Sequence, residues 1–370
     1  MNKNIPYVNL VKQTKEEKKE IFYALNKLFL VSEFILGKEV EKFEKNICKL
    51  LNIKRCVALN SGTDALTLGL HLLGVKRGDE VITTPNSFIA STASIVHLGA
   101  IPIFCDVKDD QNIDPREIEK KISKKTKAIM PVHLSGRSSE MDTIIKISKK
   151  YKIPVIEDAA QSIGTKYNNK QVGTFGKVGC FSAHPLKNLN AMGDGGYLVT
   201  NDEKIANKAA SLRNHGIVNR NFVSSFGHVS RMDNLQAAVL NIRFKKLKKV
   251  ISQRRINAKL YFKLLKSQKN IILPKEGKNE FNTYHTFVIQ AKNRDKLKEY
   301  LEKKGISTAI HYPKLIFQQK AYKKKFNPPK RNEFLVAKKL VKNILTLPVN
   351  QFLRSNEIYR ISNEINKFYN

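Results

Sequence analysis

Short apolar runs alternate along this chain with longer segments in which apolar residues recur at helical spacing. Runs rich in β-branched residues predict buried strands, and the spaced apolar positions predict amphipathic helices. Strands are predicted at 55–59, 81–85, 101–106, 128–134, 154–158, 197–200, 286–290 and 307–311. Helices are predicted at 12–30, 39–51, 115–123, 141–151, 240–265, 294–304 and 356–369.

The alternation of strands and helices through the first part of the chain predicts a mainly parallel sheet with right-handed crossovers. In such sheets the binding site lies at the carboxyl ends of the strands. We expect two domains: a larger one over 1–245, which includes an N-terminal arm, and a smaller one over 246–370, which begins with a linking helix.

Two segments bring polar residues to predicted strand ends. In the first, the β-branched run 155–158 ends in the carboxylate of Asp158. In the second, Lys187 lies between the apolar segment 181–186 and a glycine-rich turn at 193–196. An acid at a strand end and a lysine in a nearby loop are what a pyridoxal phosphate site needs, because the lysine amine binds the cofactor and the acid keeps the pyridine nitrogen protonated. Most lysines of so basic a chain lie on solvated faces, so Lys187 by itself is a weak signal.

A strand, a tight turn and a predicted helix start follow one another after residue 55. The turn 60–63 precedes Leu66, Leu70 and Leu73, which lie on one helical face. Free backbone N–H groups and the helix dipole at such a terminus can bind a phosphate. A simple Ser or Thr N-cap explains the same residues, so both interpretations stay open at this point.

Phe88 follows the predicted strand at 81–85. An aromatic ring there can lie flat against a pyridine ring and exclude water from it. A buried core phenylalanine fits the same position, and the spacing alone does not decide between the two.

The composition is strongly basic, with 67 Lys and Arg against 32 Asp and Glu and a formal net charge of +35. Such a charge is typical of nucleic-acid-binding proteins, yet no recognised nucleic-acid motif accompanies the basic clusters at 243–269 and 323–325. Lysine, asparagine and isoleucine are all abundant, which is typical of proteins from AT-rich genomes. We therefore expect no nucleic-acid partner.

The four cysteines, at positions 48, 56, 105 and 180, show no paired short spacing and no accompanying histidine pattern. They predict buried thiols in a reducing compartment and no metal site. No apolar run approaches the roughly 18 residues of a membrane-spanning helix, and the first residues lack the apolar core of a signal peptide. A cytoplasmic protein that does not contact a membrane is expected.

With these motifs in this order, the chain resembles the DegT/DnrJ/EryC1/StrS family of sugar aminotransferases, which are fold type I pyridoxal phosphate enzymes. The resemblance extends from Phe34-Ile35-Leu36-Gly37 to Thr346-Leu347-Pro348. It implies an α/β fold in which a large domain with a mainly parallel sheet flanked by helices carries a smaller α+β C-terminal domain. It also implies pyridoxal 5'-phosphate as cofactor, with pyridoxamine 5'-phosphate formed in turnover.

The resemblance assigns roles to individual residues. Lys187 is the catalytic residue, which holds the cofactor and then moves the proton; Asp158 pairs with the pyridine nitrogen and Gln161 with the ring oxygen. The expected cofactor-binding residues are Gly62, Thr63, Phe88, Asp158, Gln161, Ser182 and Lys187. The expected substrate-binding residues are His184, Arg231, His311 and Tyr312. For His184 simple packing remains an alternative, and His311 and Tyr312 could equally be an ordinary strand end.

The ten residues from Lys187 to Gly196 read Lys-Asn-Leu-Asn-Ala-Met-Gly-Asp-Gly-Gly. They resemble family members that aminate carbon 3 of a sugar more than those that aminate carbon 4. The resemblance therefore implies transamination of a nucleotide-linked 3-keto sugar, a dTDP-3-keto-6-deoxyhexose, with glutamate as amino donor. The alternatives are a 4-keto sugar aminotransferase of the same family and a non-catalytic regulatory or binding protein on this fold. The positive charge of the chain would attract the anionic nucleotide.

A second family block departs from the usual pattern. The block normally begins Gly-x-Asn-x-Arg, and its asparagine reaches the cofactor phosphate of the neighbouring subunit. Here Gly227-His228-Val229-Ser230-Arg231 places Val229 at the asparagine position, and valine has no side-chain donor. The resemblance still implies a homodimer with shared active sites, in which Ser230, His228 or a lysine replaces this contact and the Arg231 guanidinium suits the substrate phosphates.

Overall fold

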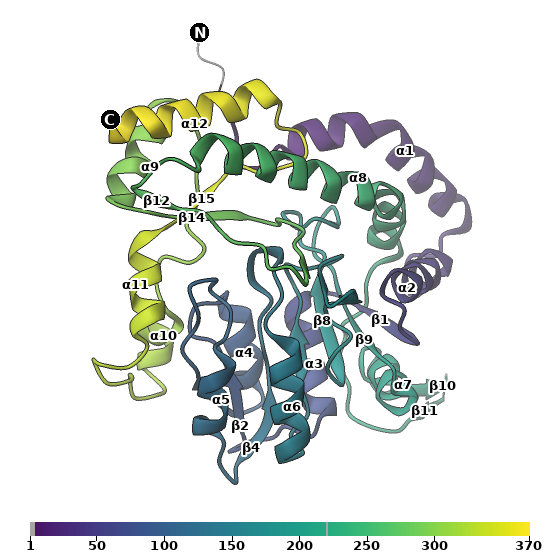
Figure 1. Cartoon of the computed structure of the whole chain (residues 1–370). Helices are drawn as coiled ribbons and strands as arrows, with labels where there is room; N and C mark the ends of the chain where they lie inside the picture. Colours follow the sequence, from purple (N-terminus) through teal and green to yellow (C-terminus); the bar gives the residue numbers. More distant parts are fainter. Residues whose placement is uncertain (1–3, 220) are drawn as a thin grey trace.

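The structure, a computed structural model, describes residues 4–219 and 221–370. The first three residues, part of the segment assessed for a signal peptide, and residue 220 lie outside this description. Figure 1 shows the helices α1, α8 and α12 along one side of the molecule and the helices α3, α4, α5 and α6 around the strands on the other.

A seven-stranded sheet forms the centre of the larger part. Its strands are β1 (Arg55–Leu59), β2 (Glu80–Thr83), β3 (Ile101–Phe104), β4 (Thr126–Ile129), β5 (Ile156–Asp158), β8 (Val178–Ser182) and β9 (Gly196–Thr200). Hydrogen bonding gives the groups β3-β2-β4 and β1-β9-β8-β5, and parallel bridges from Ile129 to Val155 and from Val132 to Asp158 join β4 to β5. Only β9 runs antiparallel to its neighbours, so the predicted mainly parallel sheet is confirmed.

Helices cover this sheet, and all of them except α4 and α7 lie where the apolar spacing predicts a helix. They are α1 (Leu10–Val31), α2 (Lys38–Leu51), α3 (Gly62–Leu72), α4 (Ile89–His97), α5 (Pro115–Lys121), α6 (Met141–Tyr151) and α7 (Glu203–Leu212). The fully buried Leu66 and Leu70 of α3 pack in one core cluster with Ile156 of β5 and Leu198 of β9. Burial of these side chains holds the N-terminus of α3 against the carboxyl ends of the central strands.

A second, antiparallel sheet has the order β12-β14-β15. Its strands are β12 (Ile271–Ile272), β14 (Phe287–Ala291) and β15 (Ile344–Leu347). The helices of this part of the chain are α8 (Asn234–Leu265), α9 (Arg294–Lys303), α10 (Lys320–Lys323), α11 (Leu335–Asn343) and α12 (Ser355–Tyr369). Its own core cluster includes Tyr261 of α8, Phe287 of β14 and Ile361 of α12, all fully buried. The remaining short elements are β6 (Lys166–Tyr167), β7 (Lys170–Gln171) and β13 (Glu280–Phe281), which form a small sheet, the hairpin β10 (Ile217–Asn219) and β11 (Phe222–Val223), and the 3₁₀ turns η1 (Leu134–Gly136) and η2 (Ile316–Gln318).

Two predicted strands are wrong in part. The segment 307–311 is no strand: it is extended chain joined to β15 by a single bridge between Ala309 and Thr346. The predicted strand at 128–134 ends early, because β4 stops at Ile129 and a 3₁₀ turn occupies Leu134–Gly136. In that turn Ser135 has a φ of 63°, which a strand does not allow.

Three of the four cysteines are buried, as predicted, whereas Cys48 is partly exposed. Within the residues that the structure describes, no helix combines the length and the apolar character needed to cross a membrane.

Candidate active site

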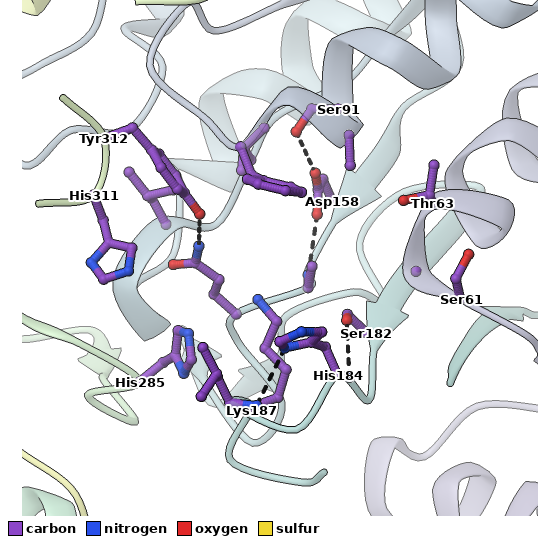
Figure 2. Close-up of a pocket in the computed structure, with 18 of the residues that line it drawn as sticks. Ser61, Thr63, Ser91, Asp158, Ser182, His184, Lys187, His285, His311 and Tyr312 are labelled. Atoms are coloured by element: carbon purple, nitrogen blue, oxygen red, sulfur yellow. Dashed lines mark hydrogen bonds between the residues drawn. The ribbon is translucent and has the colours of Figure 1, made fainter. Parts of the chain in front are cut away.

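A cavity of about 350 Å³ lies where β5 and β8 end, between the large sheet and the segments that lead into the small one. Figure 2 shows Lys187 extending from its loop toward the middle of this cavity. Ser61, Thr63 and Ser182 lie on one side of it, and His311 and Tyr312 lie on the other.

Asp158 is the last residue of β5 and is only 4% exposed. Its Oδ2 accepts a hydrogen bond of 2.7 Å from the Ser91 hydroxyl, and its Oδ1 accepts one of 3.1 Å from the Ala160 N–H. Desolvation raises the pKa of this carboxyl, while the two hydrogen bonds oppose the rise. A cation bound beside it would offset the cost of burying the carboxylate.

Lys187 lies in the turn after β8, where its N–H donates to the His184 carbonyl at 2.8 Å. Desolvation by the surrounding protein lowers the pKa of its amine to about 8, and the charge of Asp158 acts in the opposite direction. A substantial fraction of this amine is therefore uncharged at mildly alkaline pH. An uncharged lysine amine is the nucleophile that carbonyl chemistry requires.

The side of the cavity that Ser61, Thr63 and Ser182 line is suited to an anion. The hydroxyl of Ser61 caps α3 by accepting from the Asp64 N–H at 3.0 Å, and the helix then starts at Gly62. A Cβ added at Gly62 would lie 2.8 Å from the Cβ of Ser182, so glycine allows α3 to approach β8 this closely. The N-cap interpretation therefore holds for Ser61, and Gly62 and Thr63 of the same helix start line the cavity.

Gln161 joins the turn at Ser135 to Tyr312 across the cavity. Its Oε1 accepts from the Ser135 N–H at 2.8 Å, and its Nε2 donates to the Tyr312 hydroxyl at 3.1 Å. The second N–H of this amide remains available to a ring oxygen in the cavity. Desolvation lowers the pKa of the neighbouring His311 to about 4, with the charge of Lys187 as a further cause, so this imidazole is neutral.

Phe88 and His184 complete the group of predicted residues in the cavity. Phe88 is 56% exposed, and its ring centroid lies 5.8 Å from that of Tyr312. It is therefore no core residue, and its exposed face can cover a flat ring. His184 is exposed, and its Nδ1 accepts from the Leu186 N–H at 3.3 Å.

These residues suit pyridoxal phosphate. The buried carboxylate of Asp158 could pair with a pyridine nitrogen, the exposed face of Phe88 is available for a ring, and a helix N-terminus with Ser182 is available for a phosphate. The Ser182 hydroxyl accepts from the His184 N–H at 3.2 Å and keeps its own proton for donation. No group of three or more His, Cys, Asp or Glu among the described residues could hold a metal ion.

The structure does not bring Arg231 into this cavity. Its Nη1 donates to the Asn214 side chain at 2.9 Å, and it does not line the cavity of its own chain. Ser230, one of the residues considered as a substitute for the asparagine, is fully buried and donates to Asp64 of the same chain at 2.7 Å. Val229 itself is 54% exposed.

Several residues of the cavity escaped the sequence analysis: Tyr7, Ser91, Arg254, His285 and Asn350. Ser91 lies 67 positions from the Asp158 carboxylate to which it donates. Arg254 is 4% exposed and donates to the carbonyls of Tyr284 and His285 and to the Gln351 side chain. None of these residues stands in a motif, and only the contacts of the folded chain identify them.

Comparison with known proteins identifies relatives over nearly the whole chain. Residues 15–366 match the DegT/DnrJ/EryC1/StrS aminotransferase family. A dTDP-3-amino-3,6-dideoxy-alpha-D-galactopyranose transaminase of Aneurinibacillus thermoaerophilus is 37% identical over 98% of this chain and 99% of its own. A pleiotropic regulatory protein of Geobacillus stearothermophilus is 37% identical over 99% of both chains.

Solved structures agree with these relatives. The crystal structure of DesV from S. venezuelae in complex with a ketimine intermediate superposes with a TM-score of 0.95 at 32% identity, covering 99% of this chain and 98% of that one. The match supports the fold type I architecture that the sheet order shows. Sequence, fold and cavity agree, and the chain belongs to the DegT/DnrJ/EryC1/StrS family as a sugar aminotransferase.

Proposed function

We propose that this enzyme transfers an amino group from glutamate to carbon 3 of a dTDP-3-keto-6-deoxyhexose, in amino-sugar biosynthesis. One observation carries the choice of carbon 3: the loop from Lys187 to Gly196 has the form associated with 3-amination. In support, relatives at 37% identity include a dTDP-3-amino-sugar transaminase and a UDP-N-acetyl-3-dehydro-glucosamine aminotransferase.

Bound pyridoxal phosphate would act as the electron sink that makes the α-carbon of the donor acidic. Lys187 would hold the cofactor, and its released amine would carry the proton from the donor carbon and later return one to the sugar. A pKa near 8 suits this task, because the amine can both accept and release a proton near neutral pH. Asp158 would keep the ring nitrogen protonated, and Ser91 would orient the Asp158 carboxylate.

The other residues would fix the cofactor and the sugar. Gly62, Thr63 and Ser182 would bind the phosphate, Phe88 would cover the ring, and Gln161 would donate to the ring oxygen. His184, His311 and Tyr312 line the remainder of the cavity, and we assign them to the sugar. The neutral state of His311 suits hydrogen bonding to a hydroxyl rather than pairing with a phosphate.

We also propose a homodimer. Large apolar side chains stay exposed along the second half of α1 and the turn after it: Phe22, Tyr23, Phe29, Leu30, Val31, Phe34 and Ile35, between 42% and 86%. A second copy of the chain would cover them. In this arrangement Arg231 would serve the neighbour's active site. A monomer with tightly bound cofactor in sedimentation analysis would contradict the shared site.

Two further features belong to the proposal. We place the boundary of the large domain at residue 245, inside α8, so that this helix links the two parts. We place the enzyme in the cytoplasm, where its four free thiols would stay reduced.

The position of the new amine tests the proposal. The protein is loaded with pyridoxal phosphate and glutamate, 3-keto and 4-keto dTDP-6-deoxyhexoses are offered separately, and the product is examined by NMR. Amination at carbon 3 supports the proposal. Amination at carbon 4 alone would overturn the choice of carbon while leaving the sugar aminotransferase assignment in place.

A regulatory role is the second candidate, because the relative from Geobacillus stearothermophilus carries the name of a pleiotropic regulatory protein. A purely regulatory protein would not need Lys187 and Asp158 in one cavity, and this chain has both. The two functions separate in a cell that carries Lys187→Ala: loss of the amino sugar alone supports the enzyme, whereas an unchanged phenotype would favour regulation.

A further inference from the structure

The inner face of α1 carries two polar residues where a packed helix normally carries apolar ones. The buried residues of this helix are Gln13, Glu17, Ile21 and Leu28. Gln13 and Glu17 are four positions apart, so their side chains lie on the same face of the helix. Each is only 6% exposed. A buried polar group is costly unless it is hydrogen-bonded, and both residues have specific partners outside α1.

The partner of Gln13 lies in the loop that carries Lys187. Nε2 of Gln13 donates to Oδ1 of Asn190 at 3.0 Å, and Nδ2 of Asn190 donates to Oε1 of Gln13 at 3.2 Å. Asn190 is itself buried. The two amides form a reciprocal pair, and because each uses both its donor and its acceptor, the pair fixes which way the Asn190 amide faces.

Asn190 closes the loop around Lys187. Its Nδ2 also donates to the Pro185 carbonyl at 2.7 Å. Pro185 and Asn190 stand on either side of Lys187 in the sequence, so this hydrogen bond closes the segment 185–190 into a ring. If the Asn190 amide turned over, its oxygen would face the Pro185 carbonyl and the bond would be lost. The orientation that Gln13 imposes therefore keeps the ring closed.

A buried ion pair holds α1 in place beside this loop. α1 lies alongside α8 (Figure 1), and Nε of Arg243 on α8 donates to a Glu17 carboxylate oxygen at 2.8 Å. Nη1 of Arg243 donates to the carbonyls of Asn190 and Ala191 at 2.8 and 2.9 Å. Removing one partner of a buried ion pair is strongly destabilising. The pair therefore keeps α1 against the loop, and Gln13 is a firm support for Asn190.

From these contacts we propose that Gln13 is a positioning residue for the catalytic lysine: through Asn190 it keeps the loop closed and holds the Lys187 amine inside the cavity. Gln13 does not line the cavity, so it acts without touching cofactor or substrate. The inference rests on the proposed role of Lys187 in holding the cofactor. A closed loop keeps the amine desolvated, whereas a loop that opens lets water reach it.

The solvation of the amine can be measured through its pKa. Desolvation is the largest cause of the lowered pKa of Lys187, and the charge of Asp158 acts in the opposite direction. The charge of Lys187 in turn lowers the pKa of three imidazoles, those of His184, His285 and His311. Replacing Gln13 changes none of these groups. A rise in the pKa of Lys187 in such a variant therefore reports the entry of water.

Gln13→Leu tests the inference, because leucine is of similar size and makes no hydrogen bond to Asn190. The matched control is Gln268→Leu: Nε2 of Gln268 also donates to an asparagine side chain, that of Asn366 at 3.4 Å, but Gln268 lies outside the cavity and far from the loop in sequence. The rate at which the full-length, cofactor-free proteins take up pyridoxal phosphate is measured as a function of pH.

We expect the midpoint of this pH dependence to lie near 8 for the wild type and for Gln268→Leu. In Gln13→Leu the midpoint should rise by about one pH unit and the rate at pH 7 should fall roughly tenfold, because about a tenth as much of the amine is then uncharged. A general loss of stability would not move the midpoint. An unchanged midpoint in Gln13→Leu, or an equal shift in Gln268→Leu, would overturn the inference.

Asn190→Ala tests whether Gln13 acts through Asn190, and it carries the test alone if Gln13→Leu does not fold. This variant opens the ring directly and should raise the midpoint at least as far as Gln13→Leu does. In the Asn190→Ala background Gln13→Leu should have no further effect, since two residues that act in one chain of contacts are not additive. An unchanged midpoint in Asn190→Ala, or fully additive shifts, would overturn the inference. A wild type that takes up no cofactor would instead contradict the proposed function.

Discussion

Replacing Lys187 by methionine should stabilise the cofactor-free protein. The folded protein lowers the pKa of this amine from 10.5 to about 8. A difference of one between the pKa values of the folded and the unfolded chain corresponds to about 1.4 kcal/mol, so keeping Lys187 charged in the folded state at pH 7 costs about 3 kcal/mol. Methionine has nearly the same length and no charge, and it removes this cost. We expect Lys187→Met to raise the free energy of unfolding by about 3 kcal/mol at pH 7.

The sign of the pH dependence follows from the depressed pKa. Below pH 8 the amine is charged in both the folded and the unfolded chain, and the full cost of burying the charge applies. Between pH 8 and 10.5 the folded chain has lost this proton while the unfolded chain retains it, so the wild type gains stability as the pH rises. The advantage of Lys187→Met should therefore shrink to about 1 kcal/mol at pH 10.

Urea unfolding of the cofactor-free proteins at pH 7 and pH 10, at one protein concentration, measures both values. Lys208→Met is the matched control, because Lys208 is exposed on α7 and outside the cavity. The free energy of unfolding of Lys208→Met should stay within about 0.5 kcal/mol of the wild-type value at both values of pH. The inference that the Lys187 amine is desolvated would be wrong if Lys187→Met were no more stable than the wild type. It would also be wrong if the gain in free energy of unfolding were the same at both values of pH.

Further predictions concern the same cavity. Ser91→Ala removes the donor to the Asp158 carboxylate and should lower kcat roughly tenfold, whereas Ser94→Ala, whose hydroxyl donates instead to the Ser91 carbonyl, should leave kcat nearly unchanged. Asp158→Asn should retain the visible absorbance of bound cofactor and lose roughly 100-fold or more in kcat, and near-normal turnover would exclude the carboxylate role. The rate at which cofactor-free protein takes up pyridoxal phosphate should rise with pH, with a midpoint near 8, because only the uncharged Lys187 amine reacts. A pH-independent rate would contradict that assignment.

Local sequence pattern predicted much of the fold. The strand at 55–59 and the helix at 141–151 begin and end as expected, because their apolar spacing and flanking turn residues are local signals. The prediction of a strand at 307–311 is wrong. The apolar pattern of this segment matches a strand, but only Ala309 pairs with a residue of β15. Pairing between strands depends on residues that are distant in the sequence, so a local pattern does not predict it.

In the cavity, too, some residues could be predicted from local sequence and others could not. Asp158, Ser182 and Lys187 stand at or just after strand ends, so order along the chain was enough to bring them together. Ser91 and Arg254 reach the cavity from helices whose own sequences carry no motif. Arg231 belongs to a motif, yet it stays outside the cavity of its own chain and donates to Asn214 instead.

We infer that Lys187 and Asp158 together perform transamination in this cavity. The most direct test is the first half-reaction: cofactor-loaded protein is mixed with glutamate, and the release of 2-oxoglutarate is followed together with the loss of the visible absorbance of the lysine-bound cofactor. We expect one 2-oxoglutarate per chain from the wild type and none on the same timescale from Lys187→Ala. Release at the wild-type rate by Lys187→Ala, or none by a fully loaded wild type with any amino donor, would contradict it.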